Sequence, residues 1–273
     1  MNNTIIRCFI LLFLVTHGLA QVTISPTSIF VNSKEPFGTF LVLNGTDKTQ
    51  EVSISFPFGY PGSDSTGKII MNYSDTAMAD KFSIEQWVSG FPRSFVLEPN
   101  QRQVVRVTVR PTEILSPGTY WTIIKTKSNE VAPEIGVPQK DKITAEIRFV
   151  FEQITTLLYQ SGELSTGLKI NDLRTKIDDH NATVISDVEK TGNSPFLGTM
   201  EVKIFNSAGA EVKRNQVFVS IYMSGSRKLD VGLDDLPPGQ YSAEVKFYPN
   251  RMDIPEHFNI TAESVIKMVN FNL

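Results

Sequence analysis

The feature that most constrains the fold of this chain is a regular succession of short runs in which apolar and polar residues alternate. Runs such as FGTFLVLNG, QEVSISFPF, QVVRVTVRP and YWTIIKTK are rich in Val, Ile, Thr and Phe. Turn-forming pairs, among them Asn44-Gly45 and Pro117-Gly118, separate these runs. Alternation with a period of two is typical of half-buried strands, and short strands at regular spacing are typical of a sandwich or barrel. We therefore expect an all-β fold.

The run from Arg102 to Arg110 allows two interpretations. Its arginines recur every four residues, as a stripe for an anionic partner would, whereas its valines alternate, as in a strand. Residues two apart share one face of a strand, and antiparallel sheets commonly have one solvated face. We favour the structural interpretation, with valines in a core and arginines in solvent. The valines are Val105, Val107 and Val109, and the arginines are Arg102, Arg106 and Arg110.

A second series of strand-like runs follows a looser stretch after Phe151. It includes LKINDLRTKI, NATVISDVEK, LGTMEVKIFN, QVFVSIYM and GQYSAEVKFYP. Two series of this length fit two Ig-like β-sandwich domains in tandem, expected at residues 21–158 and 165–273. No segment has a long amphipathic helical pattern, and DTAMADKFSIEQWV, the nearest to one, is ambiguous.

The first twenty residues resemble a secretory signal peptide. Arg7 is followed by a short apolar run, and small residues precede an expected cleavage after Ala20. The run is too short to span a bilayer, which requires about 20 apolar residues. We expect an exported, periplasmic protein, with the cell surface as an alternative. No cysteine follows Cys8, so core packing rather than disulfides must stabilise the remaining chain.

Residues suited to catalysis or metal binding are sparse and scattered. His180 and His257 are each isolated, and the Asp178-Asp179 pair lies beside turn-forming residues, where solvated carboxylates are ordinary. No nucleophile elbow, phosphate loop or calcium loop occurs. Trp87 and Trp121 fit a core better than a sugar-binding platform. We expect neither an enzyme nor a cofactor, and the net charge of −3 does not favour binding to nucleic acid.

Binding remains as the expected activity, and the strand KITAEIRFVF is its best candidate. Five apolar residues share one face of this strand: Ile143, Ala145, Ile147, Phe149 and Phe151. Such a row can belong to a core. On an edge strand, the same row and the open backbone can bind an extended peptide by strand addition. The alternation leaves both interpretations open.

The order of the segments resembles a known family. VTISPTSIFV, FVLEPNQRQVVRVTV, ILSPGTYWTIIKTKSNEVAP and ITAEIRFVF are similar to successive parts of the first domain of the periplasmic pilus-assembly chaperones, the PapD-like family. LPPGQYSAEVKF is similar to part of the smaller second domain. The chain thus resembles a divergent member of this family over nearly all of its length after Ala20.

The resemblance implies a chaperone that caps incomplete β-sandwich subunits of pili or surface proteins by donating the apolar row from Ile143 to Phe151. It also implies that two cations hold the carboxylate of the client between the domains. Ser28 stands at one of these positions, and Arg148 approximately matches the other, which makes Arg148 the candidate anchor. The alternative is a structural or adhesive envelope protein that uses two Ig-like domains as a spacer. No membrane insertion of the mature chain is expected.

Overall fold

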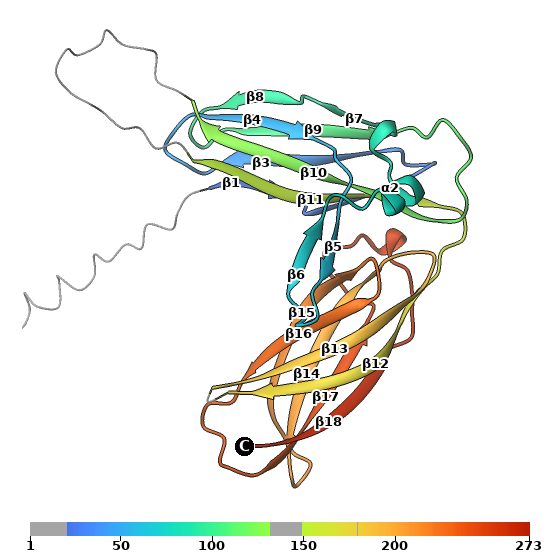
Figure 1. Cartoon of the computed structure of the whole chain (residues 1–273). Helices are drawn as coiled ribbons and strands as arrows, with labels where there is room; N and C mark the ends of the chain where they lie inside the picture. The colour runs from blue at the N-terminus through green and yellow to red at the C-terminus, as the bar shows by residue number, and fades with distance from the viewer. Residues whose placement is uncertain (1–20, 132–148, 179) are drawn as a thin grey trace, which may run out of the picture.

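The computed structural model describes residues 21–131, 149–178 and 180–273, and it consists of two β-sandwiches that meet like the arms of an L (Figure 1). In each sandwich, two sheets pack face to face around a core of their own. The expected all-β class of two Ig-like sandwiches in tandem is confirmed. The expected signal peptide lies outside the described residues and stays a prediction.

The first sandwich pairs a four-stranded sheet with a five-stranded sheet. The four-stranded sheet has the order β1 (Val22–Ser25), β3 (Phe37–Asn44), β9 (Arg102–Val109), β7 (Val88–Phe91). The five-stranded sheet has the order β2 (Ser28–Asn32), β11 (Val150–Ser161), β10 (Gly118–Glu130), β4 (Gln50–Ser55), β8 (Ser94–Leu97). Partners far apart in sequence, such as β4 and β10, give the crossed connections of an immunoglobulin-like sandwich.

Two stretches of chain change from one sheet to the other at a proline. β1 pairs with β3, whereas β2 pairs with β11 in the opposite sheet, and Pro26 lies between them. β7 and β8 are divided in the same way at Pro92. Proline has no N–H to donate to a ladder, which favours a break at these points. The run VTISPTSIFV thus forms two strands rather than one.

The core of the first sandwich confirms the interpretation of the arginine-rich run. Val105, Val107 and Val109 are at most 1% exposed and pack between the sheets. The arginines of the same segment, Arg102, Arg106 and Arg110, are all exposed. Arg106 lies over the ring of Phe37, 4.2 Å from its centroid. The four-residue spacing of the arginines thus reflects one solvated strand face.

The second sandwich consists of a three-stranded and a four-stranded sheet. The first has the order β12 (Thr166–Ile177), β13 (Asn181–Gly192), β16 (Gly225–Gly232). The second has the order β15 (Glu211–Ile221), β14 (Phe196–Asn206), β17 (Gln240–Tyr248), β18 (Val265–Asn272). Strict alternation places Ala243, Val245 and Phe247 of β17 in the core with no exposure. The C-terminus lies at the end of this sandwich far from the first one (Figure 1).

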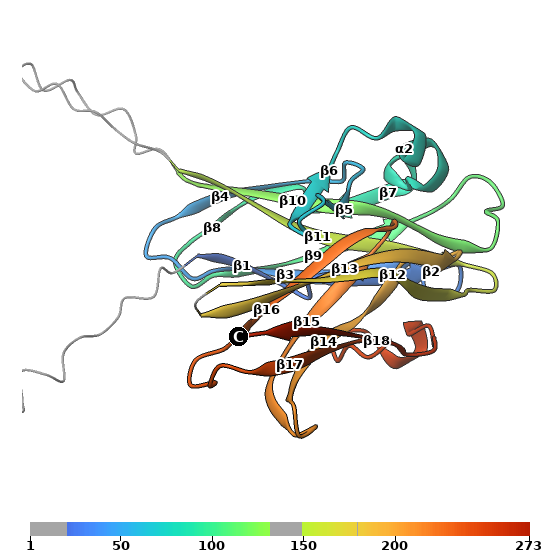
Figure 2. The ribbon, with the colours of Figure 1, turned by 60° about the horizontal axis from the view of Figure 1, so that its bottom comes forward.

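An insertion between β4 and β7 carries a hairpin, a short helix and a single helical turn. These are β5 (Tyr60–Ser63), β6 (Ile69–Asn72), α2 (Thr76–Phe82) and η1 (Glu85–Trp87). The ambiguous segment DTAMADKFSIEQWV is thus helical in two short pieces. Asp75 begins α2, because its Oδ1 accepts a hydrogen bond from the Met78 N–H at 3.1 Å. The hairpin and α2 lie on the same side of the first sandwich (Figure 2).

A third cluster of buried apolar residues joins the sandwiches. Trp121, 1% exposed, stacks on Phe82 with ring centroids 4.7 Å apart and meets Tyr222 of the second sandwich edge-on at 4.8 Å. The expectation that Trp121 is a core residue is confirmed. Trp87 is half-buried against the core of the first sandwich, and its Nε1 donates to Thr112. The two sandwiches thus bury apolar side chains against each other, and we call this group of residues the interdomain cluster.

Candidate functional site

β11 has a partner along only part of one edge. Its other edge pairs with β10 over the whole strand, from Val150 to Ser161. On the edge opposite to β10, β2 pairs in parallel with only five residues of β11, Thr156–Gln160. From Val150 to Thr155 this edge has no partner strand among the described residues. Unpaired backbone on a strand edge is a template for an additional strand.

Side chains of β11 change from buried to exposed along one face. Leu157 and Tyr159 belong to the core of the first sandwich, with 0% and 6% exposure. Nearer the start of the strand, on the same face, Phe151 is 52% exposed, and Phe149, just before the strand begins, is 67% exposed. The rings of Phe149 and Phe151 lie 6.4 Å apart. The row of core side chains on β11 thus continues beyond the core as two exposed phenylalanines.

Polar atoms beside the open edge lack partners. Gln153 donates from Nε2 to the Val22 carbonyl at 2.7 Å, but its buried Oε1 accepts no hydrogen bond from the described residues. The buried hydroxyls of Thr126 and Thr155 on the same strand pair are also unpartnered among the described residues. An open groove of about 370 Å³ runs between β1 and this part of β11, lined by Ile24, Gln153 and Thr155 among others. Buried polar groups are usually satisfied, so these side chains of β10 and β11 are exceptions.

The opposite face of the same strands is charged. Glu152 accepts from Lys125 at 3.3 Å and from Lys127 at 2.9 Å, and these hydrogen bonds hold the pKa of the Glu152 carboxyl below its usual range. Lys125 also lies 5.4 Å from the ring centroid of Tyr73, which follows the β5–β6 hairpin. The charged side chains of this part of the sheet therefore lie on the face opposite to Phe149 and Phe151.

The structure places only part of the expected binding row. Phe149 and Phe151 lie beside the open edge, whereas Ile143, Ala145 and Ile147 lie outside the described residues. Arg148, the candidate carboxylate anchor, also lies outside them, so its role stays a prediction.

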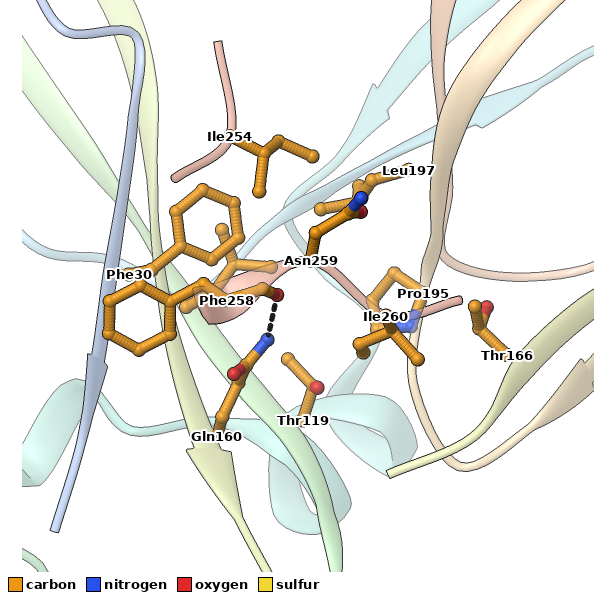
Figure 3. Close-up of a pocket in the computed structure, with 11 residues that line it drawn as sticks. Phe30, Thr119, Gln160, Thr166, Pro195, Leu197, Ile254, Phe258, Asn259 and Ile260 are labelled. Atoms are coloured by element: carbon orange, nitrogen blue, oxygen red, sulfur yellow. Dashed lines mark hydrogen bonds between the residues drawn. The ribbon is translucent and has the colours of Figure 1, made fainter. Parts of the chain in front are cut away.

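Ser28 begins β2, which pairs with β11 near the junction of the two sandwiches. The β11 residue directly paired with Ser28 is Thr156. Next to them, the segment between β17 and β18 packs onto the first sandwich, with the helical turn η2 (Glu256–Phe258) at its centre. Phe258 stacks on Phe30 with centroids 5.7 Å apart, and its carbonyl accepts from Gln160 Nε2 at 2.9 Å (Figure 3).

The space left in this cleft is small. A cavity of about 10 Å³ lies among Phe30, Leu197, Ile254 and Phe258, with the Gln160 amide at its edge (Figure 3). A cavity of this size holds about one water molecule. The described part of the cleft is therefore packed by the chain itself rather than shaped for a ligand.

In the described part of the chain, side chains suited to metal binding lie apart from one another. Among residues 21–131, 149–178 and 180–273, no three His, Cys, Asp or Glu side chains gather as metal ligands would. His180 and His257 lie at separate surface sites, where each faces one carboxylate, of Asp234 and Glu35 respectively. No helix within the described part of the chain is long and apolar enough to cross a membrane.

Comparison with known proteins gives similarity at the level of structure alone. No family model and no curated protein matches the sequence. The structure of the YadV chaperone is 11% identical with a TM-score of 0.44, and the match covers 93% of this chain and 100% of that chain. The structure of the Salmonella enterica SafA pilin in complex with the SafB chaperone matches with 14% identity and a TM-score of 0.44, covering 92% and 98%.

A third similar structure is that of the class 5 fimbriae chaperone CfaA. It is 13% identical with a TM-score of 0.42, and the match covers 91% of this chain and 98% of that chain. Each of the three structures contains a chaperone. Their TM-scores lie below 0.5 and their identities below 25%, so these similarities carry no function over to this chain.

Proposed function

We propose that this protein is an exported chaperone-like protein that binds extended strands of pilus or surface subunits by donating the first part of β11 and the residues before it. The observation that carries this proposal is the coincidence of an open backbone edge, Val150–Thr155, with two exposed phenylalanines on the face that forms the core. A solvent-facing spacer has no need for either feature.

The proposed mechanism is donor-strand complementation. A β-sandwich that lacks one strand exposes both an unpaired edge and a groove in its core. A donated strand supplies backbone hydrogen bonds to the edge and apolar side chains to the groove. Burial of each phenylalanine, Phe149 and Phe151, would contribute about 1.5–3 kcal/mol. Ile143, Ala145 and Ile147 would extend the same row, and Arg148 would bind a client carboxylate.

The proposed compartment is the periplasm, reached by the signal peptide expected at residues 1–20. The client would be a subunit with an incomplete β-sandwich. Because one edge of β11 is already paired with β10, the client strand would continue the five-stranded sheet from the free edge, next to β2.

The test is capture of a client by a pair of matched variants. In Phe149→Asp/Phe151→Asp, two exposed phenylalanines of the proposed donor row become charged. In the control, Phe91→Asp, a phenylalanine that is 81% exposed on the distant strand β7 becomes charged. Each tagged protein is produced in its native cell, purified from the envelope, and its partners are identified by mass spectrometry.

We expect the wild type and Phe91→Asp to retain a β-rich subunit and the double variant to lose it. All three proteins should have the same circular dichroism spectrum, because the substituted side chains are exposed. Equal capture by the double variant, or capture of no subunit by any of the three proteins, would overturn the proposal. The second result would favour a structural spacer.

A further inference from the structure

The β5–β6 hairpin leaves the first sandwich and contacts the second. Ser63 Oγ accepts hydrogen bonds from the Ser226 N–H at 2.9 Å and from Arg227 Nη1 at 3.1 Å. The carbonyl of Ser65 accepts from Arg174 Nη2 at 3.4 Å. Figure 1 shows β5 and β6 reaching from the first arm of the L toward β15 and β16. A hairpin of the first sandwich is thus hydrogen-bonded to the second at its tip.

Both ends of the hairpin are held rigidly. At its base, the Tyr60 hydroxyl donates to Asp75 Oδ2 at 2.6 Å, and the Tyr60 ring lies in the interdomain aromatic cluster. At its tip, Asp64 Oδ1 accepts from the N–H groups of Thr66 and Lys68 and from the Thr66 hydroxyl. These hydrogen bonds fix the turn without help from the second sandwich, so the hairpin is preformed.

At the tip of the hairpin, the backbone of Gly67 lies close to the backbone of the second sandwich. Gly67 has a φ of +80°, and a Cβ atom at this position would lie 2.8 Å from the backbone nitrogen of Lys228. A side chain of any size there would separate the hairpin from β16. Gly209, in the turn between β14 and β15, has a nearly equal φ of +77°, but a Cβ atom there would have no neighbour within 4 Å. Both glycines therefore have a positive φ, but only Gly67 lies against the other sandwich.

Arg227 is the least expected residue in this contact. It is 3% exposed, and its hydrogen bonds within the described chain go to neutral oxygens, of Ser63, Ser220 and Ser226, while its Nε has no partner there. Burial lowers the pKa of the guanidinium to about 10. A buried charge without a paired carboxylate adds little stability, and replacement by an apolar side chain is often neutral or favourable. Arg227 instead makes the contact between the sandwiches directional, because its planar guanidinium requires acceptors at fixed positions.

We propose that the β5–β6 hairpin is a clamp that fixes the angle between the two sandwiches, and that Arg227 selects the docked geometry rather than stabilising the fold. The proposal does not depend on the proposed chaperone function. Inter-domain contacts within a chain usually permit relative motion unless the interface is large and apolar. Here the clamp adds a directional polar contact beside the apolar cluster, and the two arms behave as one body.

The experiment measures the distance between the arms by electron paramagnetic resonance. Cys8 is the only cysteine, so Cys8→Ser permits spin labels at Asp47→Cys in the first sandwich and Lys176→Cys in the second, both exposed. The labelled protein without further change is compared with four variants of it: Gly67→Ala, Ser63→Ala, Arg227→Met and the control Gly209→Ala. Circular dichroism and thermal unfolding of each protein establish that it is folded.

We expect one narrow distance distribution for the wild type and Gly209→Ala, and clearly broader distributions for Gly67→Ala, Ser63→Ala and Arg227→Met. Arg227→Met should broaden the distribution without lowering the midpoint of thermal unfolding. Ser63→Ala removes a single hydroxyl and tests the same contact if Gly67→Ala does not fold. A distribution that stays narrow in Ser63→Ala and Arg227→Met, or broadens equally in Gly209→Ala, overturns the clamp.

Discussion

Tyr222 illustrates how single residues of the second sandwich depend on the first. It is 2% exposed in the interdomain cluster, and burial raises the pKa of its hydroxyl to about 12. Its ring lies against Trp121 of β10 and Tyr60 of the hairpin. A neutral tyrosine is therefore required for the packed arrangement of the two arms.

Alkaline pH should weaken the fold through this residue. A tyrosine in the unfolded chain ionises near pH 10. The folded state holds Tyr222 neutral up to about pH 12, so its contribution is complete below pH 10 and is lost as the pH rises from 10 to 12. We expect about 2 kcal/mol of the unfolding free energy to disappear over this window. Chemical denaturation at stepped pH checks this result.

Tyr222→Phe is the matched control for the alkaline loss. It keeps the ring and removes the ionisable hydroxyl, so its denaturation midpoint should fall less between pH 10 and 12 than that of the wild type. Equal losses in the two proteins would show that Tyr222 does not carry the effect.

Residues that follow the local alternation could be predicted from the sequence, and residues that depend on the second arm could not. Val105, Val107 and Val109 are placed in the core by their spacing alone. Arg227 lies next to Ser226 and Lys228 in a strand that reads as ordinary, and nothing in this neighbourhood indicates burial. Its burial results from contact with a hairpin more than 150 positions away, at Ser63.

At the scale of elements, β11 shows why the last strand of the first sandwich was only half recognised. The stretch EQITTLLYQ has no clear alternation, and the sequence suggested that the strand pattern loosens there. In the structure both faces of this part are buried: Leu157 and Tyr159 in the first core, and Leu158 in the interdomain cluster. Strands buried on both faces read as continuous apolar runs, so the usual signal is lost.

The hairpin β5–β6 was missed for a different reason. Each of its strands has only four residues, and Ile69 and Ile70 are both exposed, so no period of two develops. The hairpin also contains Pro61-Gly62, a pair typical of turns, inside β5. Its position is determined by contact with the second sandwich, which local sequence does not record.

Stability should follow a gradient along β11. Leu157→Ala removes a fully buried side chain and should cost about 2–5 kcal/mol of unfolding free energy. Phe149→Ala and Phe151→Ala remove exposed rings and should each change it by about 0.5 kcal/mol or less. Urea denaturation of the three variants checks the gradient. A large loss in either phenylalanine variant would mean that the aromatic row belongs to the core of the protein itself.

At the scale of the whole molecule, the two arms of the L are joined by an apolar cluster, by η2 and by the hairpin. The cluster includes Tyr60 of the hairpin and Phe258 of η2, so all three contacts lie at the junction of the arms. The open part of β11 lies at the other end of the same strand, away from Thr156–Gln160. The molecule thus has one closed end, where the sandwiches meet, and one end with an unfinished edge.

The most direct test of strand addition at this edge is hydrogen–deuterium exchange along β11, in the free protein and in the complex with its captured subunit. In the free protein, we expect rapid exchange of the amides within Val150–Thr155 that point away from β10, and slow exchange within Thr156–Gln160, where β2 already pairs. In the complex, exchange of those open-edge amides should become slow while the β2-paired segment stays unchanged. Protection of the open-edge amides in the free protein, or no change on binding, would contradict the account.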